Sequence, residues 1–305
     1  MHGIPIILAT LIRSLSSQPL PPDFPLALAD ATGEMVVFTE APRRIVSLSP
    51  DFTENLFALG AGDRIAGVTA FCDYPPAAAG KKRVGDLWTP NLEEILALAP
   101  DLVLATQEGN RPQAVKALRE LKLKVFVSPP ARSVEGYLRN LSELARMVGA
   151  AEQGEELAAR LRSEIARAHG RSAGWKRPRV FLQLGRSPLV TAAWGTIIGD
   201  LIEIAGGENI AAASPLRYPS FSREQVIADD PDIIIVALEK REAEVCRKEW
   251  EEFASLSAAK SGRICTLDPD LVSRAGPRLV DGLRALEGMI RTIDGQPQAE
   301  GARSR

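Results

Sequence analysis

The sequence is poor in the residues that most often hold metal ions. Its 305 residues include two histidines, His2 and His169, and three cysteines, Cys72, Cys246 and Cys265. A His/Cys metal cage would need nearly all of them to converge from distant parts of the chain, so most zinc chemistry is excluded and no metal site is predicted. Three cysteines define no disulfide framework, and a Cys246–Cys265 disulfide stays open on the sequence alone.

The chain also lacks an excess of charge of either sign. Its 37 Lys and Arg nearly balance its 39 Asp and Glu, which gives a formal net charge of −2. There is no basic field to attract a phosphate backbone, so nucleic acid is not an expected partner.

No apolar run is long enough to cross a membrane. The run Ile4–Ile12 is about half of the roughly 20 residues that a spanning helix needs. It suits a secretory signal, although no Lys or Arg precedes it, and cleavage at Ala27–Ala29 would cut apart two short strands expected around Thr32–Gly33. We expect residues 1–25 to be a signal or a disordered leader, with export to the periplasm or another extracytoplasmic compartment in the first case. The polar tail 294–305 is expected to be disordered.

Several motifs of familiar enzymes are absent as well. Neither G-x-x-x-x-G-K-[ST] nor G-x-G-x-x-G nor H-E-x-x-H occurs in the chain. A nucleophile would need a positioned base, and His169, the one histidine outside the N-terminal segment, lies in a polar helical stretch where a surface role is usual. We therefore expect no catalytic residue and no enzyme, with a two-lobed cytoplasmic α/β enzyme as the alternative from another class.

What the sequence does contain is a repeated alternation of strands and helices. At 305 residues, of which 45% are hydrophobic, the chain exceeds the size at which one core stops growing. The alternation runs through both halves and predicts the α/β class, with a mostly parallel central sheet in each of two lobes. We expect lobes at 26–148 and 175–293, joined by one long α-helix over 149–174. The alternative is that this helix belongs to the surface of one lobe.

An internal repeat supports two related lobes. Glu93 precedes Pro100-Asp101 and a four-residue apolar strand, and Glu224 precedes Pro231-Asp232 and another such strand, 131 residues later. Pro-Asp ends a helix and turns the chain into a buried strand. The recurrence is therefore also compatible with a helix-to-strand junction that is common in α/β proteins and needs no duplication. We predict that the lobes are pseudo-duplicates.

Several strings, taken together, resemble one protein family. They are PRRIVSLSP at 42–50, CDYPP at 72–76, NLE at 91–93, GGENI at 206–210 and SREQV at 222–226. Their order, from about residue 40 to 290, is similar to that of the solute-binding proteins that feed ABC importers of cobalamin, ferric siderophores and haem. The similarity is greatest to the cobalamin-binding members. The resemblance implies two α/β lobes joined by one long helix.

The resemblance implies a binding subunit rather than an enzyme. Such a subunit captures cobalamin or another corrinoid between its lobes, as transported ligand and not as cofactor, and delivers it to an ABC permease dimer in the cytoplasmic membrane. A monomer before docking is implied as well. Haem or a ferric siderophore on the same fold stays open as the alternative ligand, because Tyr74, Tyr137 and Tyr218 are available as iron ligands although histidine is not.

The resemblance also places ligand-binding residues in the cleft between the lobes. Flat apolar corrin faces call for aromatic walls, and their amide rim calls for hydrogen-bonding groups. The residues at such positions, or able to replace a lost wall, are Phe71, Trp88, Trp194, Tyr218, Asp270 and Arg274. The chain departs from the family at Leu87, which fills the aromatic position beside Trp88, and at Thr106 and Val190, which replace two further aromatics.

Glu93 and Glu224 stand where the family presents one exposed carboxylate per lobe to arginines of the two permease subunits. Both also fall in the first turn of an expected helix, after the N-cap residues Asn91 and Ser222, where a carboxylate favours the helix dipole. The two roles are compatible, and we predict both.

Overall fold

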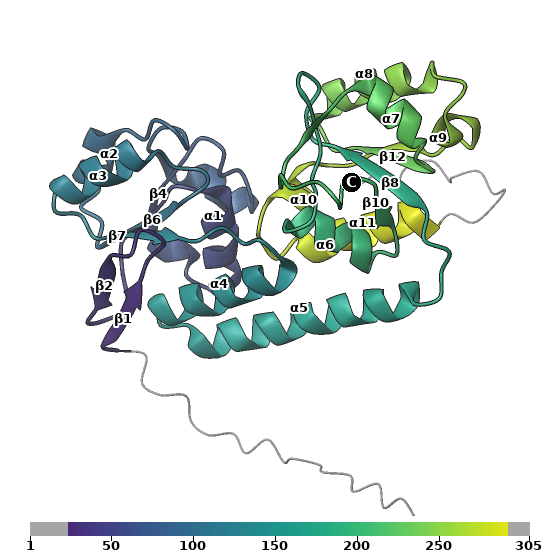
Figure 1. The fold of residues 1–305 in the computed structure, drawn as a ribbon. Helices are drawn as coiled ribbons and strands as arrows, with labels where there is room; N and C mark the ends of the chain where they lie inside the picture. Colours follow the sequence, from purple (N-terminus) through teal and green to yellow (C-terminus); the bar gives the residue numbers. More distant parts are fainter. Residues whose placement is uncertain (1–23, 292–305) are drawn as a thin grey trace, which may run out of the picture.

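The computed structural model describes residues 24–291, which form two α/β lobes connected along one side by a long helix (Figure 1). Residues 1–23 of the expected leader and the expected tail at 294–305 lie outside the described residues. In the described part of the chain, no helix is both long and apolar enough to span a membrane.

The N-terminal lobe is built on a five-stranded parallel sheet with the order β5-β4-β3-β6-β7. Its strands are β3 (Ile45–Ser47), β4 (Ile65–Val68), β5 (Lys82–Arg83), β6 (Leu102–Thr106) and β7 (Val125–Ser128). The helices of this lobe are α1 (Pro50–Ala58), α2 (Leu92–Ala97), α3 (Pro112–Glu120) and α4 (Val134–Met147), with 3-10 turns at Gly62–Arg64 and Pro76–Gly80. The two short strands expected around Thr32–Gly33 are an antiparallel hairpin of β1 (Leu26–Ala29) and β2 (Met35–Phe38).

The C-terminal lobe repeats this plan with a four-stranded parallel sheet of order β10-β8-β12-β13. The strands are β8 (Arg179–Gln183), β10 (Glu208–Asn209), β12 (Ile233–Val236) and β13 (Ile264–Thr266), beside a small antiparallel pair of β9 (Leu189–Val190) and β11 (Ser220–Phe221). The helices are α6 (Ile197–Ile204), α7 (Arg223–Asp229), α8 (Lys240–Glu251), α9 (Ser257–Lys260), α10 (Asp270–Ser273) and α11 (Leu279–Arg291). The predicted α/β class with parallel central sheets is confirmed.

The connecting helix α5 (Ala151–Ser172) runs along the base of both lobes (Figure 1). Gly149 separates it from α4, because its φ of +64° is a backbone conformation that ends a helix and that glycine adopts without steric cost. One face of α5 packs on α4, and the helix also contacts α6 and α11 of the C-terminal lobe. Arg171 fixes the far end through a paired hydrogen bond to the Glu287 carboxylate, at 2.6 and 2.7 Å. The helix therefore contacts both lobes.

The Pro-Asp repeat has the same structural role in each lobe. Asp101 accepts the backbone N–H of Arg44 at 3.0 Å, and the Arg44 guanidinium donates to a carbonyl at the end of α2. Asp232 accepts the backbone N–H of Arg179 at 2.8 Å, and the Arg179 guanidinium donates to a carbonyl at the end of α7. In each case the aspartate and the arginine join a helix C-terminus to the start of the neighbouring strand, which agrees with a duplicated unit.

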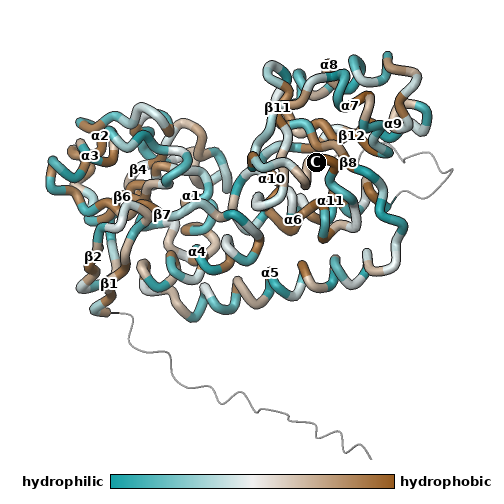
Figure 2. Tube along the Cα trace, in the orientation of Figure 1, coloured by the Kyte–Doolittle hydropathy of each residue, from teal (hydrophilic) through white to brown (hydrophobic). Residues whose placement is uncertain are grey.

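The apolar strands lie inside both lobes, and the helices turn polar faces outward (Figure 2). One buried cluster extends from β3 and α1 through α4 and α5 to α6 and α11, so the two lobes share apolar contacts at the base of the molecule. Burial of apolar surface stabilises by about 25 cal/mol per Å². The continuous cluster therefore limits how far the lobes can separate.

The three cysteines, Cys72, Cys246 and Cys265, are all buried. Cys246 carries a free thiol, so the Cys246–Cys265 disulfide that the sequence left open is not formed.

Candidate ligand-binding site

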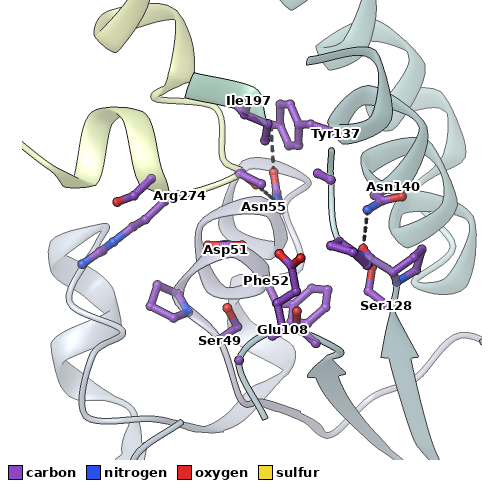
Figure 3. Close-up of a pocket in the computed structure, with 18 of the residues that line it drawn as sticks. Ser49, Asp51, Phe52, Asn55, Glu108, Ser128, Tyr137, Asn140, Ile197 and Arg274 are labelled. Carbon is purple, nitrogen blue, oxygen red and sulfur yellow. Dashed lines mark hydrogen bonds between the residues drawn. The ribbon is translucent and has the colours of Figure 1, made fainter. Parts of the chain in front are cut away.

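A cavity of about 340 Å³ lies between the two lobes (Figure 3). On the N-terminal side its walls follow the carboxyl ends of parallel strands: Ser49 and Asp51 come after β3, Glu108 after β6 and Pro129 after β7. This edge is where open parallel sheets bind ligands, because the loops there are free to carry side chains of any chemistry. Residues around the start of α6, Tyr218 and residues 272–275 of the C-terminal lobe close the other side.

Most polar groups of the lining are hydroxyls and amides. They belong to Ser49, Asn55, Thr106, Ser128, Tyr137, Asn140, Tyr218 and Ser273. The lining residues that the structure describes include no His, Cys or Met. Within residues 24–291, moreover, no cluster of three or more His, Cys, Asp and Glu side chains is arranged to hold a metal ion.

A buried ion pair joins the lobes beside the cavity. Glu54 of α1 is 3% exposed, and its two carboxylate oxygens accept hydrogen bonds from Arg278 at 2.9 and 2.6 Å. Arg274 adds a third hydrogen bond to Glu54 at 3.2 Å. A buried carboxylate is costly unless it is paired and hydrogen-bonded, and here both requirements are met by the opposite lobe.

Arg274 lines the cavity, and its guanidinium is paired with three carboxylates of the protein. It forms ion pairs with Asp73 at 2.6 Å and with Asp270 at 2.7 Å, in addition to its bond to Glu54. The hydrogen bond from Arg274 holds the pKa of Asp73 below its usual range. The structure thus brings the predicted residues Asp270 and Arg274 together, as a pair that is already neutralised.

Asp51 is a carboxylate of the cavity wall without such compensation. Among the described residues, no Lys or Arg side chain lies within ion-pair distance of it. Burial raises its pKa to about 6, and the nearby carboxylate of Glu54 adds to the shift, whereas Arg274 and the backbone N–H of Ala275 oppose it.

Asn55 forms a second polar link between the lobes, and Tyr137 of its own lobe holds the Asn55 side chain. The Tyr137 hydroxyl donates to the side-chain carbonyl of Asn55 at 3.1 Å, and the Asn55 amide donates to the carbonyl of Ala275 at 2.8 Å (Figure 3). Tyr137 is 2% exposed, and burial raises its pKa far above the usual range. Its hydroxyl is therefore occupied and neutral.

The predicted aromatic residues occupy three different situations. Tyr218 lines the cavity. Phe71 and Trp88 pack edge to face, with ring centroids 5.8 Å apart, and Trp88 follows Leu87 of the cavity wall. The backbone N–H of Trp88 donates to Asp86, which fixes the turn that presents the indole. Trp194 is 78% exposed and does not line the cavity.

A further ion pair bridges the lobes at the cavity. Arg217, next to Tyr218, donates to the Glu108 carboxylate at 2.5 Å. Both side chains are more than a third exposed. The backbone carbonyl of Arg217 also accepts the N–H of Ala193 at 2.8 Å, which ties this contact to the loop that carries Trp194.

Sequence reasoning missed several residues of this site, namely Asp51, Asn55, Glu108, Ser128 and Asn140. Their side-chain types did not single them out in the sequence. What could have identified Asp51, Glu108 and Ser128 is their place in the chain, at or shortly after the ends of predicted strands. Tyr74, expected as a candidate iron ligand, instead lies 4.1 Å from the Arg278 guanidinium, which covers its ring.

Glu93 and Glu224 are exposed at the starts of α2 and α7, which lie on the face of the molecule opposite α5 (Figure 1). The expected N-caps are present: Asn91 accepts the backbone N–H of Glu94 and Ser222 accepts that of Gln225, each at 3.1 Å. Hydrogen bonds from its own N–H and from Ser222 lower the pKa of Glu224.

One G-x-S-x-G string, which is found in many hydrolases, does occur at 170–174, at the end of α5. The Ser172 hydroxyl donates to the carbonyls of His169 and Ile204 at 3.1 and 2.9 Å, and the residue is 7% exposed. The string ends a helix instead of forming a strand-to-helix turn, so it is not a nucleophile elbow.

Comparison with known proteins agrees with this architecture. The sequence profile of the periplasmic binding protein family matches residues 45–271. The chain belongs to this family. A vitamin B12-binding protein of Photorhabdus laumondii is 35% identical over 240 residues, which are 79% of this chain and 85% of that protein.

Two solved structures of periplasmic binding proteins have the same fold. The periplasmic vitamin B12 binding protein BtuF of Vibrio cholerae is 30% identical, with a TM-score of 0.72 over 82% of this chain and 97% of its own. The periplasmic haem-binding protein RhuT of Roseiflexus sp. RS-1 is 28% identical, with a TM-score of 0.74 over 81% and 97%. The relatives named here are binding proteins and not enzymes.

Proposed function

We propose that this periplasmic binding protein captures cobalamin or a related corrinoid between its lobes and hands it, chemically unchanged, to an ABC permease. The observation that carries the proposal is the lining of the cavity. Hydroxyl and amide groups alternate with Tyr218 and with apolar residues such as Phe52 and Ile197. A flat apolar macrocycle with an amide rim needs both kinds of contact.

The same lining favours a corrinoid over haem. Tyrosine binds haem iron as a phenolate, and Tyr218 is the lining tyrosine whose hydroxyl forms no hydrogen bond with the residues that the structure describes. Its pKa is raised by burial first and then by the charge of Glu108, which opposes phenolate formation. Tyr137 donates its hydroxyl to Asn55.

A ferric siderophore is disfavoured by charge. Anionic chelates are usually held by arginines with free hydrogen-bond donors. In the part of the chain that the structure describes, Arg274 is the arginine of the lining, and it is neutralised by Glu54, Asp73 and Asp270. The names of the relatives that are at least 30% identical support the same choice of ligand.

The proposal includes the partner and the location. Glu93 and Glu224, one per lobe and both exposed, would pair with arginines of the two permease subunits. α2 and α7 share the face opposite α5, so one two-fold partner could contact both at once.

Phe71, Trp88 and Trp194 would extend the aromatic wall when ligand is bound. The protein would act as an exported monomer before docking.

Titration calorimetry tests the ligand. Purified ligand-free protein is titrated with cyanocobalamin, haemin and a ferric siderophore in one buffer. We expect one-to-one binding of cyanocobalamin, at micromolar affinity or tighter, and much weaker binding of the other two. Binding of haemin or of the siderophore alone would keep the fold and overturn the ligand. If none of the three ligands binds and the protein instead converts another molecule chemically, the two-lobed enzyme would be favoured.

A further inference from the structure

We infer that the Asp51 carboxylate makes the cleft selective among corrinoids, favouring a rim of neutral amides and rejecting a rim that carries carboxylates. This inference rests on the proposed function and deepens it, because it assigns a specificity-determining residue to the proposed cleft.

The first step is the position of Asp51. It is the second residue of α1, the helix that follows β3, and its side chain lines the cavity that the opposite lobe closes. Pro50 before it and the backbone N–H of Ala275 beside it hold this corner in place. The side chain is therefore fixed where the rim of a ligand between the lobes would lie.

The second step is the balance of charge around it. Glu54, Asp73 and Asp270 are three carboxylates that share the two guanidinium groups of Arg274 and Arg278. Asp51 adds a fourth carboxylate with no cation of its own. No positive charge in this group is left over for a ligand.

The pair across the cavity does not change this balance. Glu108 and Arg217 neutralise one another at 2.5 Å. The cavity wall as a whole thus keeps an excess of negative charge beside groups that are otherwise neutral.

The third step is what such a wall recognises. A carboxylate accepts a charge-assisted hydrogen bond from a primary amide N–H, and such bonds are roughly twice as strong as neutral ones. A ligand carboxylate in the same place would meet a like charge at a buried position, where the repulsion is stronger than in bulk solvent. Asp51 therefore strengthens the binding of a ligand with an amide at this position and weakens the binding of the same ligand with a carboxylate there.

The experiment compares cyanocobalamin with its three monocarboxylate derivatives, in which one propionamide of the rim is replaced by propionate. Each is titrated calorimetrically into the wild type, Asp51→Asn and the control Asp63→Asn at about pH 8, where Asp51, with a pKa of about 6, is ionised. Asp63 is an exposed carboxylate outside the cavity lining. Asparagine keeps the shape and the carbonyl acceptor of Asp51 and removes its charge.

We expect at least one derivative to bind the wild type and Asp63→Asn about tenfold or more weakly than cyanocobalamin, and this ratio to fall below about threefold in Asp51→Asn. If every derivative shows the same ratio in Asp51→Asn as in the wild type, the inference is overturned while the proposed function stands. If the wild type does not bind cyanocobalamin, the proposed function and the inference about Asp51 are both overturned.

Discussion

Glu54 of the N-terminal lobe and Arg278 of the C-terminal lobe form a two-point ion pair, with both carboxylate oxygens engaged at 2.9 and 2.6 Å. The pair lies beside the cavity, whereas α5 runs along the base of the molecule. The two lobes are thus held together beside the cavity as well as at the base, which restricts the motion that a ligand or a permease can induce.

The first prediction concerns this pair. Glu54→Gln removes the close charged partner of Arg278 in a largely buried place and leaves it only Asp270 at 3.9 Å, so we expect the free energy of unfolding to fall by about 3 kcal/mol. Urea denaturation measures it. The control is Glu203→Gln, which removes the exposed ion pair with Arg177 and should cost at most about 1 kcal/mol. Equal losses in the two variants would contradict a structural role for the Glu54–Arg278 pair.

The second prediction is a pH dependence of stability. The pKa of Asp51 is raised from 3.8 to about 6 in the folded protein, so ionising it costs stability as the pH rises from about 4 to 6. Asp51→Asn removes this cost, and we expect the variant to be about 1–3 kcal/mol more stable than the wild type at about pH 8. The difference should shrink as the pH is lowered to about 4.5. A difference that does not change with pH would show that Asp51 does not titrate in this range.

The third prediction concerns entry of the ligand. Drug-sized ligands fill pockets of about 300–1,000 Å³, and a corrinoid is larger than these, so a cavity of about 340 Å³ must widen to admit it. The exposed Glu108–Arg217 pair opposes this opening. Arg217→Ala should raise the association rate of cyanocobalamin by about two- to fivefold in stopped-flow fluorescence, the range expected for an exposed pair.

Two controls accompany the rate measurement. Arg177→Ala removes an exposed pair outside the cavity lining and should leave the rate unchanged. Added salt should speed association to the wild type and not to Arg217→Ala. If Arg217→Ala leaves the association rate unchanged and speeds dissociation, Arg217 contacts the bound ligand and does not oppose the opening of the cavity.

The fourth prediction concerns docking. Replacing both Glu93 and Glu224 by alanine should reduce complex formation with the cognate permease by tenfold or more, about the effect of losing two charge-assisted contacts. Glu94→Ala is the matched control, because Glu94 lies on the same helix and is paired with Lys82 at 2.9 Å. Cyanocobalamin affinity should be equal in all of these variants. If the double variant docks normally, the predicted docking role is wrong, and Glu93 and Glu224 only stabilise the dipoles of their helices.

Much of the fold was predictable because its strands are continuous apolar runs. Ile233–Val236 is fully buried, and its Pro-Asp start is repeated in the other lobe. The helix α8 was not predicted, since only Ala243, Cys246 and Trp250 of its twelve residues are buried and charged residues dominate the rest. Two-residue strands such as β9 were missed because their pairing is decided by tertiary contacts rather than by a local pattern.

The site was less predictable than the fold. Arg274 and Asp270 were placed together by resemblance, but the sequence does not reveal that Glu54 and Asp73 neutralise Arg274, because those contacts join segments about 200 residues apart. The position of Asp51 in the cavity wall likewise depends on how the opposite lobe approaches α1.

The measurement that tests the central claim most directly is the calorimetric titration of cyanocobalamin into the wild type and Tyr218→Ala. Met35→Ala, which removes an exposed side chain of β2, is the control. We predict one-to-one binding to the wild type and to Met35→Ala, and about tenfold or weaker binding to Tyr218→Ala, because an aromatic contact with the corrin face is lost. Absence of binding to the wild type, or an equal affinity of Tyr218→Ala, would contradict a corrinoid held between the lobes against Tyr218.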